Sequence, residues 1–254
     1  MTEHVTYDLE DGVATITLAR PEKLNALTLE MWGAIDDFLT QADDDGARVA
    51  VLTGEGRAFC AGDDIATLRD IEDTRAVREL TKIALDCFGA IEGAPLPVVG
   101  KANGSAYGGG FELLLACDLT VVPADAEFAL PEVQIGAYPF YGAKRLARMI
   151  GRQRAADLAL AGRKLSGEEA TDWGLFARAV DADELDDAVA DIVASLKRGS
   201  PPAIETTKAW LNTSLRFAGE DDAMRAGLGY LFAGPEAQEG ARSFLEKRDP
   251  DYAE

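Results

Sequence analysis

A loose rhythm of two strands followed by a helix constrains the fold of this chain more than any other feature. Residues 5–9 alternate between apolar and polar side chains, Asp11-Gly12 is typical of a tight turn, and residues 14–18 alternate again, which predicts a β-hairpin. Thr28 is typical of a helix N-cap, and the apolar residues of 29–42 follow a helical period. The rhythm predicts an α/β fold.

The rhythm continues to about residue 180 and then gives way to helices. Further strands are expected at 49–52, 96–99, 119–122 and 127–130, helices at 74–92 and 108–117, and Gly-rich loops at 54–62 and 104–110. Ser166 and Glu169 form a capping box at the start of another helix. Later helices are expected at 183–197, 201–217, 220–232 and 235–247. We therefore predict an α/β core at 1–196 and a helical C-terminal region at 197–254.

Length and composition favour a cytoplasmic globular protein. The chain has 254 residues, 47% of them hydrophobic, which is enough to bury a core without disulfides. No apolar run approaches the ~18 residues that span a bilayer, and the first residues lack the features of a signal peptide. The three cysteines lie far apart, so we expect buried thiols and neither a disulfide framework nor a metal site.

The formal net charge of −20 is unusual for a chain of this size. It argues against broad contact with nucleic acid or an anionic membrane. Many of the acids occur in runs, such as residues 43–45. A solvated acidic surface suits a halophilic cytoplasm with molar salt, where charges are screened within ~3 Å. We therefore expect the charge to reflect the solvent and not a partner.

A single histidine, His4, limits the chemistry that the chain can perform. It lies near the N-terminus, so we exclude a Ser-His-Asp or Cys-His centre, a His-based zinc site and a histidine general base. Acid-base chemistry is left to carboxylates, Tyr, Lys or Cys.

Two Gly-rich segments, residues 58–65 and 103–112, each lead from a strand towards a helix. Small residues let a ligand approach the backbone closely, and the glycines at 108–110 expose N–H groups at a helix start. Together the segments could each supply one N–H to a developing oxyanion. Gly-rich turns are also common in α/β folds without such a role. Neither a dinucleotide-binding fingerprint nor a P-loop is present.

Two glutamates stand in apolar surroundings. Glu112 follows the glycines in an otherwise apolar helix, and Glu132 lies in the apolar stretch 129–133. Burial would raise the pKa of such carboxyls and suit them to proton transfer. Taken singly, each could instead cap a helix or pair with an arginine.

The order and spacing of these segments resemble the crotonase family, the enoyl-CoA hydratase/isomerase superfamily, along nearly the whole chain. The motifs that carry the resemblance are RPEKLNAL (20–27), FCAGDDI (59–65), NGSAYGGGFE (103–112) with Cys117-Asp118, Pro131-Glu132 with Gly136 and Pro139, LSGEEATDWGL (165–175) and FLEKRDP (244–250). The resemblance implies a spiral of ββα repeats with a helical C-terminal trimerisation region, and a homotrimer or homohexamer. It also implies an acyl-CoA substrate, with coenzyme A as part of that substrate and no separate cofactor or metal.

The resemblance assigns roles to particular residues. It implies that the N–H groups of Asp63 and Gly109 hold the thioester oxygen. A small residue is usual where Asp63 stands, so its carboxylate must point away from the oxyanion. The residues implied to lie near the adenine and pantetheine of CoA are Ala26, Ala61, Asp64 and Ile65. Lys23 and Lys247 are candidates for CoA phosphate contacts, the latter from a neighbouring subunit, or are otherwise solvated.

Hydratases of this family carry two acidic residues, and Glu112 and Glu132 fall at both positions. The implied mechanism holds a water between them. One glutamate accepts the water's proton as the oxygen attacks the β-carbon, and the other acts as an acid towards the α-carbon. We expect Glu132 to be the main proton donor and acceptor and Glu112 to position the water.

One segment departs from the family pattern. Typical hydratases have a longer Gly-rich stretch where this chain has Phe140 and Tyr141, close to the expected acyl pocket. The two rings either change packing or reshape the pocket, with Phe140 touching the substrate. The reaction is therefore open between 2-enoyl-CoA hydration and alternatives such as isomerisation, thioester hydrolysis or decarboxylation. A non-catalytic binding protein of the same fold is a further alternative, against which the glutamate pair and both loops argue.

Overall fold

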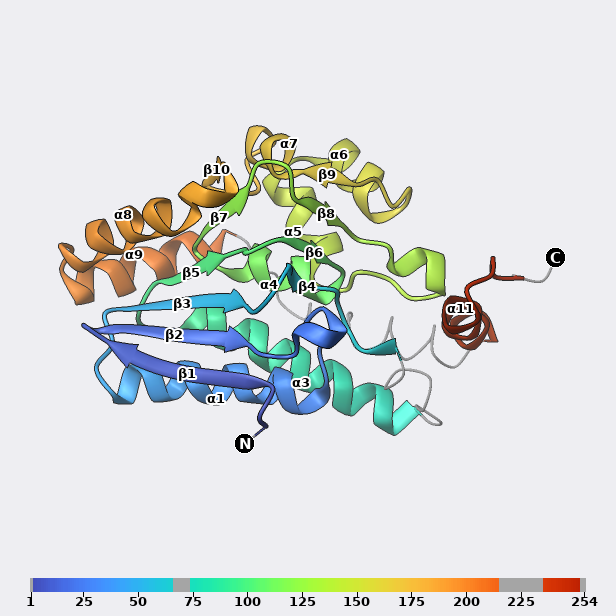
Figure 1. Cartoon of the computed structure of the whole chain (residues 1–254), viewed down its shortest axis with the longest axis horizontal. Helices are drawn as coiled ribbons and strands as arrows, with labels where there is room; N and C mark the ends of the chain where they lie inside the picture. Colours follow the sequence, from blue (N-terminus) through green and yellow to red (C-terminus); the bar gives the residue numbers. More distant parts are fainter. Residues whose placement is uncertain (1, 66–73, 215–234, 252–254) are drawn as a thin grey trace.

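The computed structural model describes residues 2–65, 74–214 and 235–251, and within these residues the strands form two sheets (Figure 1). The larger sheet has six strands in the order β1-β2-β3-β5-β7-β10. These strands are β1 (Val5–Glu10), β2 (Val13–Leu18), β3 (Val49–Gly54), β5 (Val98–Lys101), β7 (Leu119–Pro123) and β10 (Arg178–Val180). The hairpin β1–β2 is antiparallel and the other neighbours are parallel. Asp11 and Gly12 both have positive φ, as the tight hairpin turn requires.

The smaller sheet has four strands in the order β4-β6-β8-β9. They are β4 (Ala58–Cys60), β6 (Ser105–Tyr107), β8 (Glu127–Ala129) and β9 (Leu165–Ser166). The successive pairs β3–β4, β5–β6 and β7–β8 each give their first strand to the larger sheet and their second to the smaller one. This repeated path is the spiral of ββα units that the family resemblance implies.

Helices cover both faces of the larger sheet. The α-helices are α1 (Leu29–Asp44), α3 (Thr74–Gly93), α4 (Gly109–Ala116), α5 (Gly142–Met149), α6 (Arg152–Ala159), α7 (Gly167–Asp172), α8 (Leu185–Lys197), α9 (Pro201–Thr213) and α11 (Pro235–Glu246). Short 3-10 turns are η1 (Pro21–Lys23), η2 (Glu132–Ile135) and η3 (Ala182–Glu184). None of the described helices is both long and apolar enough to cross a bilayer.

Strand β3 shows how one sequence serves two cores. Ala50 and Leu52 belong to the main core, which includes α1 and α3, whereas Val49 and Val51 pack with Leu185 and other apolar side chains of α8 on the opposite face. Successive side chains of a strand point to opposite faces, so a strand buried on both faces is apolar throughout. The apolar run 49–52 fits this position.

Most of the predicted elements are present. Thr28 caps α1 by accepting from the N–H of Met31, and the capping box of Ser166 and Glu169 starts α7. The strand expected at 96–99 begins only at Val98. The helix expected at 220–232 lies outside the described residues. The described residues after β10 form helices and no strand, while a domain boundary at residue 196 stays a prediction.

The interpretation of residues 54–62 and 104–110 as loops alone is wrong. Each segment contains a three-residue strand, β4 or β6, and these two strands pair with each other. Three residues are too few to show a period of two, and their pairing partners are distant in sequence, so the local pattern gave no sign of them.

Candidate active site

Parallel pairing in the smaller sheet brings three chain segments together. Strands β4, β6 and β8 are parallel neighbours, so the segments that follow them leave from the same edge of the sheet. Gly62 and Gly108 stand in the first two of these segments with φ of +94° and +53°. A Cβ on Gly62 would lie only 3.0 Å from the carbonyl oxygen of Tyr107. The close approach of these two segments therefore depends on glycine.

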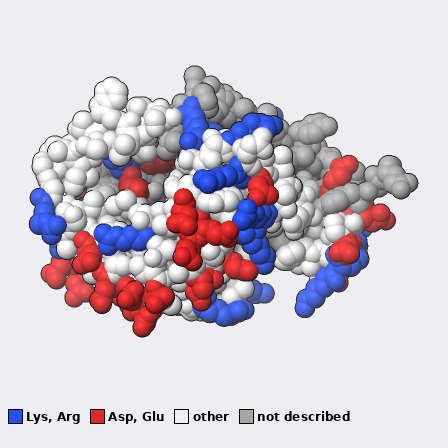
Figure 2. Space-filling model, turned by 90° about the horizontal axis from the view of Figure 1, so that it is seen from above, with Lys and Arg blue, Asp and Glu red and all other residues white. Residues whose placement is uncertain are grey.

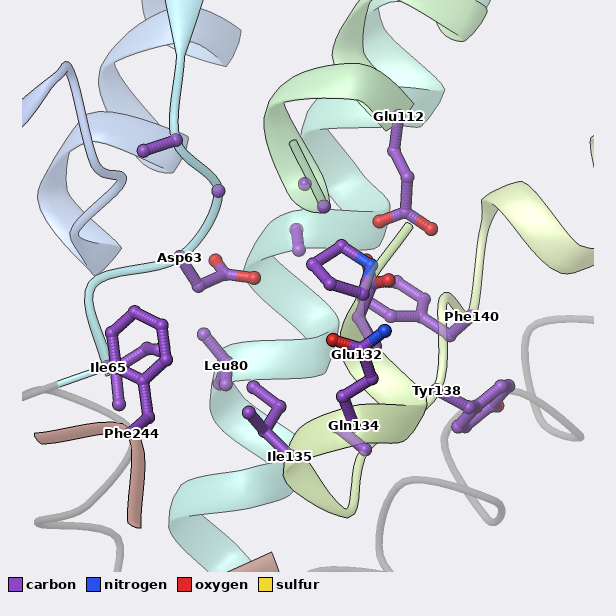
Figure 3. Close-up of a pocket in the computed structure, with 17 residues that line it drawn as sticks. Asp63, Ile65, Leu80, Glu112, Glu132, Gln134, Ile135, Tyr138, Phe140 and Phe244 are labelled. Atoms are coloured by element: carbon purple, nitrogen blue, oxygen red, sulfur yellow. The ribbon is translucent and has the colours of Figure 1, made fainter. Parts of the chain in front are cut away.

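A cavity of about 170 Å³ opens at this edge (Figure 3). Its wall is mainly apolar, with a few polar side chains, as is common for ligand pockets. The lining residues expected from the sequence are Ala61, Asp63, Ile65, Gly109, Glu112, Glu132 and Phe140. Leu80 and Ala84 of α3, Ile135 of η2 and Phe244 of α11 complete much of the apolar wall. The structure thus gathers all four predicted catalytic positions around one cavity.

Two backbone N–H groups at the cavity are suited to bind an oxyanion. Leu27 donates to the carbonyl of Gly62 and accepts from the N–H of Asp64, both at 2.8 Å, in a parallel bridge that turns the N–H of Asp63 to the opposite side. Gly109 is the first residue of α4, where N–H groups have no acceptor within the helix and the dipole is positive. Both residues line the cavity, an arrangement expected of an oxyanion hole.

Glu112 is almost completely buried, with 2% of its surface exposed. Its Oε1 accepts hydrogen bonds from the N–H groups of Tyr141, at 3.1 Å, and Gly142, at 2.7 Å, where α5 begins. Burial raises the pKa of Glu112 to about 8, although these two N–H groups act to lower it and the charge of Asp63 acts to raise it. Glu112 is therefore fixed in orientation and able to hold a proton near neutral pH.

Glu132 contrasts with Glu112 in its contacts. Both of its side-chain oxygens are buried and have no hydrogen-bond partner among the described residues. Burial raises the pKa of Glu132 well above its usual range, and the charges of Glu112 and Asp63 raise it further, against the lowering effect of its own backbone N–H. A buried carboxyl without partners costs stability, so its position is best explained by a water or substrate group that it meets in the cavity. Two such neighbouring carboxyls cannot both ionise readily, which equips the pair with one acid and one base.

Asp63 is a third carboxyl at the same cavity (Figure 3). Its Oδ1 accepts a hydrogen bond of 2.8 Å from Nε1 of Trp32. Burial raises the pKa of Asp63 to about 6, against the lowering effect of that bond. Its Oδ2 lies 3.3 Å from the point that a Cβ on Gly109 would occupy. The bond to Trp32 therefore restrains a carboxylate that lies beside Gly109.

Phe140 and Tyr141, the two aromatic residues that differ from the family pattern, have different surroundings. Phe140 lines the cavity, whereas Tyr141 is 3% exposed and stacks on Phe88 of α3 with ring centroids 4.1 Å apart. The hydroxyl of Tyr141 donates to Glu92. Phe140 thus contributes to the cavity wall, and Tyr141 packs against α3.

The other candidate CoA contacts lie outside the cavity wall. Nη1 of Arg20 donates to the carbonyl of Ala26 at 3.0 Å and pairs with Asp64 at 2.7 Å, which ties η1 to the first Gly-rich segment. Lys23 and Lys247 are exposed. Their contacts with CoA stay predictions.

Sequence reasoning missed several parts of the site. Trp32 fits the apolar period of its helix, and nothing local indicates that its indole N–H reaches Asp63. Gln134, Tyr138 and Phe244 also line the cavity, and burial together with the charge of Glu112 raises the pKa of Tyr138 to about 12. Within the described ranges, no group of three or more His, Cys, Asp or Glu side chains is placed to hold a metal ion.

Known proteins resemble this chain along its whole length. A family model described as enoyl-CoA hydratase/isomerase matches residues 8–254. A mevalonyl-coenzyme A hydratase of Aspergillus fumigatus is 35% identical to this chain, and the match covers 94% of this chain and 91% of the relative. A crotonyl-CoA hydratase of Syntrophomonas wolfei is 32% identical, and the match covers 98% of each chain. A crystal structure of an enoyl-CoA hydratase from Mycobacterium avium subsp. paratuberculosis covers 100% of both chains with a TM-score of 0.89 and 31% identity. The chain therefore belongs to the enoyl-CoA hydratase/isomerase family, within the crotonase superfamily.

Proposed function

We propose that this protein catalyses the reversible addition of water across the double bond of a 2-enoyl-CoA thioester. The observation that carries the proposal is the pair of buried carboxyls, Glu112 and Glu132, beside two N–H groups that line the same cavity. Relatives named as hydratases of crotonyl-CoA and mevalonyl-CoA support a CoA thioester as the substrate.

In the proposed reaction the thioester oxygen lies between the N–H groups of Asp63 and Gly109. They stabilise the enolate-like charge as the water oxygen bonds to the β-carbon, and losing one such donor typically costs ~10²–10³ in rate. Glu132, whose oxygens have no partner among the described residues, accepts a proton from the water as the water oxygen bonds to the β-carbon, and a proton is returned from Glu132 to the α-carbon, so Glu132 is the main proton donor and acceptor. Glu112 holds the water, because one of its oxygens is already fixed by two N–H groups.

The substrate is proposed to carry a short acyl group. The cavity beside the glutamates measures about 170 Å³, and Phe140 forms part of its wall. We assign the CoA moiety to the segment that includes Ala26, Ala61, Asp64 and Ile65, with phosphates near Lys23 and, from another subunit, Lys247. Phe140→Ala should extend the range of chain lengths that are turned over.

A homotrimer or homohexamer is proposed from the family resemblance, and exposed apolar side chains on the C-terminal helices support a contact between subunits. Trp210 and Leu211 of α9 are 72% and 66% exposed, and Phe244 of α11 is 58% exposed. Large apolar side chains left exposed on a helix can mark a contact site. Light scattering coupled to size-exclusion chromatography should give a multiple of three chains.

The acidic surface is proposed to suit high salt. Figure 2 shows acidic side chains crowded along one edge of the face it presents, with Lys and Arg more scattered. Thermal unfolding in dilute buffer and in molar KCl tests this. Full stability in dilute buffer contradicts it.

The reaction is tested by incubating the protein with crotonyl-CoA in high salt and following the loss of the conjugated thioester absorbance. We expect turnover that depends on enzyme concentration. Turnover of a 3-enoyl-CoA together with none of any 2-enoyl-CoA would reject hydration and favour the isomerase alternative.

A further inference from the structure

The N–H groups that hold Glu112 belong to a segment whose own position is set by a buried side chain. Tyr141 supplies one of these N–H groups, and its ring stacks on Phe88 with an interplanar angle of 17°. Its hydroxyl donates to Oε1 of Glu92, which also pairs with Arg145. The guanidinium of Arg145 lies 4.9 Å from the centre of the Tyr141 ring. The ring is thus held on its face and at its hydroxyl.

The charged members of this cluster are buried too. Glu92 is 8% exposed and Arg145 is 1% exposed. Replacing a buried ion pair by apolar residues is often neutral or stabilising, so stability alone is a weak reason to find one here. A role in fixing geometry is a better explanation, because the cluster joins the end of α3 to the start of α5. The side chain of Asn212 in α9 donates to the carbonyl of Glu92 at 2.8 Å and anchors the cluster further.

We propose that Tyr141, Glu92 and Arg145 are positioning residues that hold the N–H groups of residues 141 and 142 on the carboxylate of Glu112. They touch no reacting atom and act through Glu112, on whose orientation the bound water depends. The expected effect of this cluster on the reaction rate rests on the proposed hydration. Its expected effect on the position and pKa of Glu112 does not.

The electrostatic consequence has a definite sign. The two N–H groups lower the pKa of Glu112, while burial, the dominant cause, and the charge of Asp63 raise it. Other titratable groups lie nearby. Glu132 lines the same cavity, and Lys208 of α9 pairs with Asp118, which follows α4. If the 141–142 segment loosens, the N–H groups withdraw and the pKa of Glu112 must rise above about 8.

The test uses Tyr141→Phe, which removes the bond to Glu92 and keeps the ring. Tyr7→Phe is a matched control, since Tyr7 also stacks on a phenylalanine, Phe38, and donates to a carboxylate, Asp45, but lies on β1 away from the cavity. Glu92→Gln is the second variant. We expect Tyr141→Phe to lower kcat about tenfold with KM within about twofold, and Tyr7→Phe to change neither.

Two further readouts separate positioning from a general loss of structure. Carbon-13 NMR titration of the Glu112 carboxyl without substrate should show a pKa higher by about half a unit or more in Tyr141→Phe and unchanged in Tyr7→Phe. In a Glu112→Gln background, Tyr141→Phe should have little further effect on kcat. The NMR result decides the proposal even if the wild type hydrates no enoyl-CoA. A folded Tyr141→Phe whose Glu112 titrates as in the wild type overturns it, whatever happens to the rate.

Discussion

Two carboxyl sites at opposite ends of α4 are used in opposite ways. At the start of the helix Glu112 faces Glu132 and Asp63 across the cavity, and burial raises the pKa of all three. Just after its end, Asp118 accepts from the N–H of Val98 and pairs with Lys208, each at 2.7 Å. Lys208 in turn donates to the carbonyls of Ile91 and Leu96.

The comparison shows which partners make a charged side chain part of the structure. Asp118 is satisfied by a cation and a backbone donor, and it joins α9 to the sheet. Glu132 has no such partners among the described residues, so its burial costs stability and keeps a proton available. We therefore place the proposed chemistry at the start of α4, where the carboxyls face one another.

The largest expected effect comes from removing the acid-base group itself. Glu132→Gln keeps the shape of the side chain but cannot accept or return the proton of the water. We expect kcat with crotonyl-CoA to fall by about 10³-fold or more, while CoA binding by calorimetry stays near the wild-type value. An unchanged rate would remove Glu132 from the mechanism.

Breaking the ion pair of Lys208 with Asp118 should lower the stability of the protein and leave its kcat unchanged. Lys208→Met leaves Asp118 without its cation, and we expect the free energy of unfolding to fall by about 2 kcal/mol. This is less than for a fully buried pair, because the Asp118 side chain keeps 20% exposure. Urea denaturation measures the loss. A matching fall in kcat per folded molecule would show that the two sites are not separate.

A smaller effect is expected on the pH dependence of stability when Glu132 is replaced. The pKa of Glu132 is raised in the folded state, so the wild type loses stability as pH rises from the unfolded value of ~4.3 towards the folded one. Glu132→Gln cannot ionise, so its stability relative to the wild type should improve as the pH rises from 4 to 8. Urea denaturation at both values checks this, and a constant difference would contradict it.

The smallest effect is expected at Asp63. Asp63→Asn keeps an acceptor for Trp32 and removes a negative charge near the oxyanion position. Because the pKa of Asp63 is about 6, the variant should turn over a few-fold faster than the wild type at pH 8, and the advantage should vanish below pH 6. A slower variant at every pH would mean that the carboxylate assists the reaction.

The fold was largely predictable because its long elements carry strong periodic patterns, as in α1 and the run 49–52. The site was predictable only in part. Motif order pointed to Glu112, Glu132 and the two N–H groups, but β4 and β6, which bring them together, are too short to show a pattern. The contacts of Trp32 with Asp63 and of Tyr141 with Glu92 join residues 31 and 49 positions apart, and only the folded chain reveals them.

The central claim is that Glu112 and Glu132 form a buried pair that retains a proton at neutral pH. Carbon-13 NMR titration of the two carboxyls in the substrate-free protein tests it most directly, with Asp118 as an internal reference. We predict that the pair still holds at least one proton at pH 7 and loses the last only above about pH 8. Two carboxyls that are both fully ionised by pH 6 would contradict the claim.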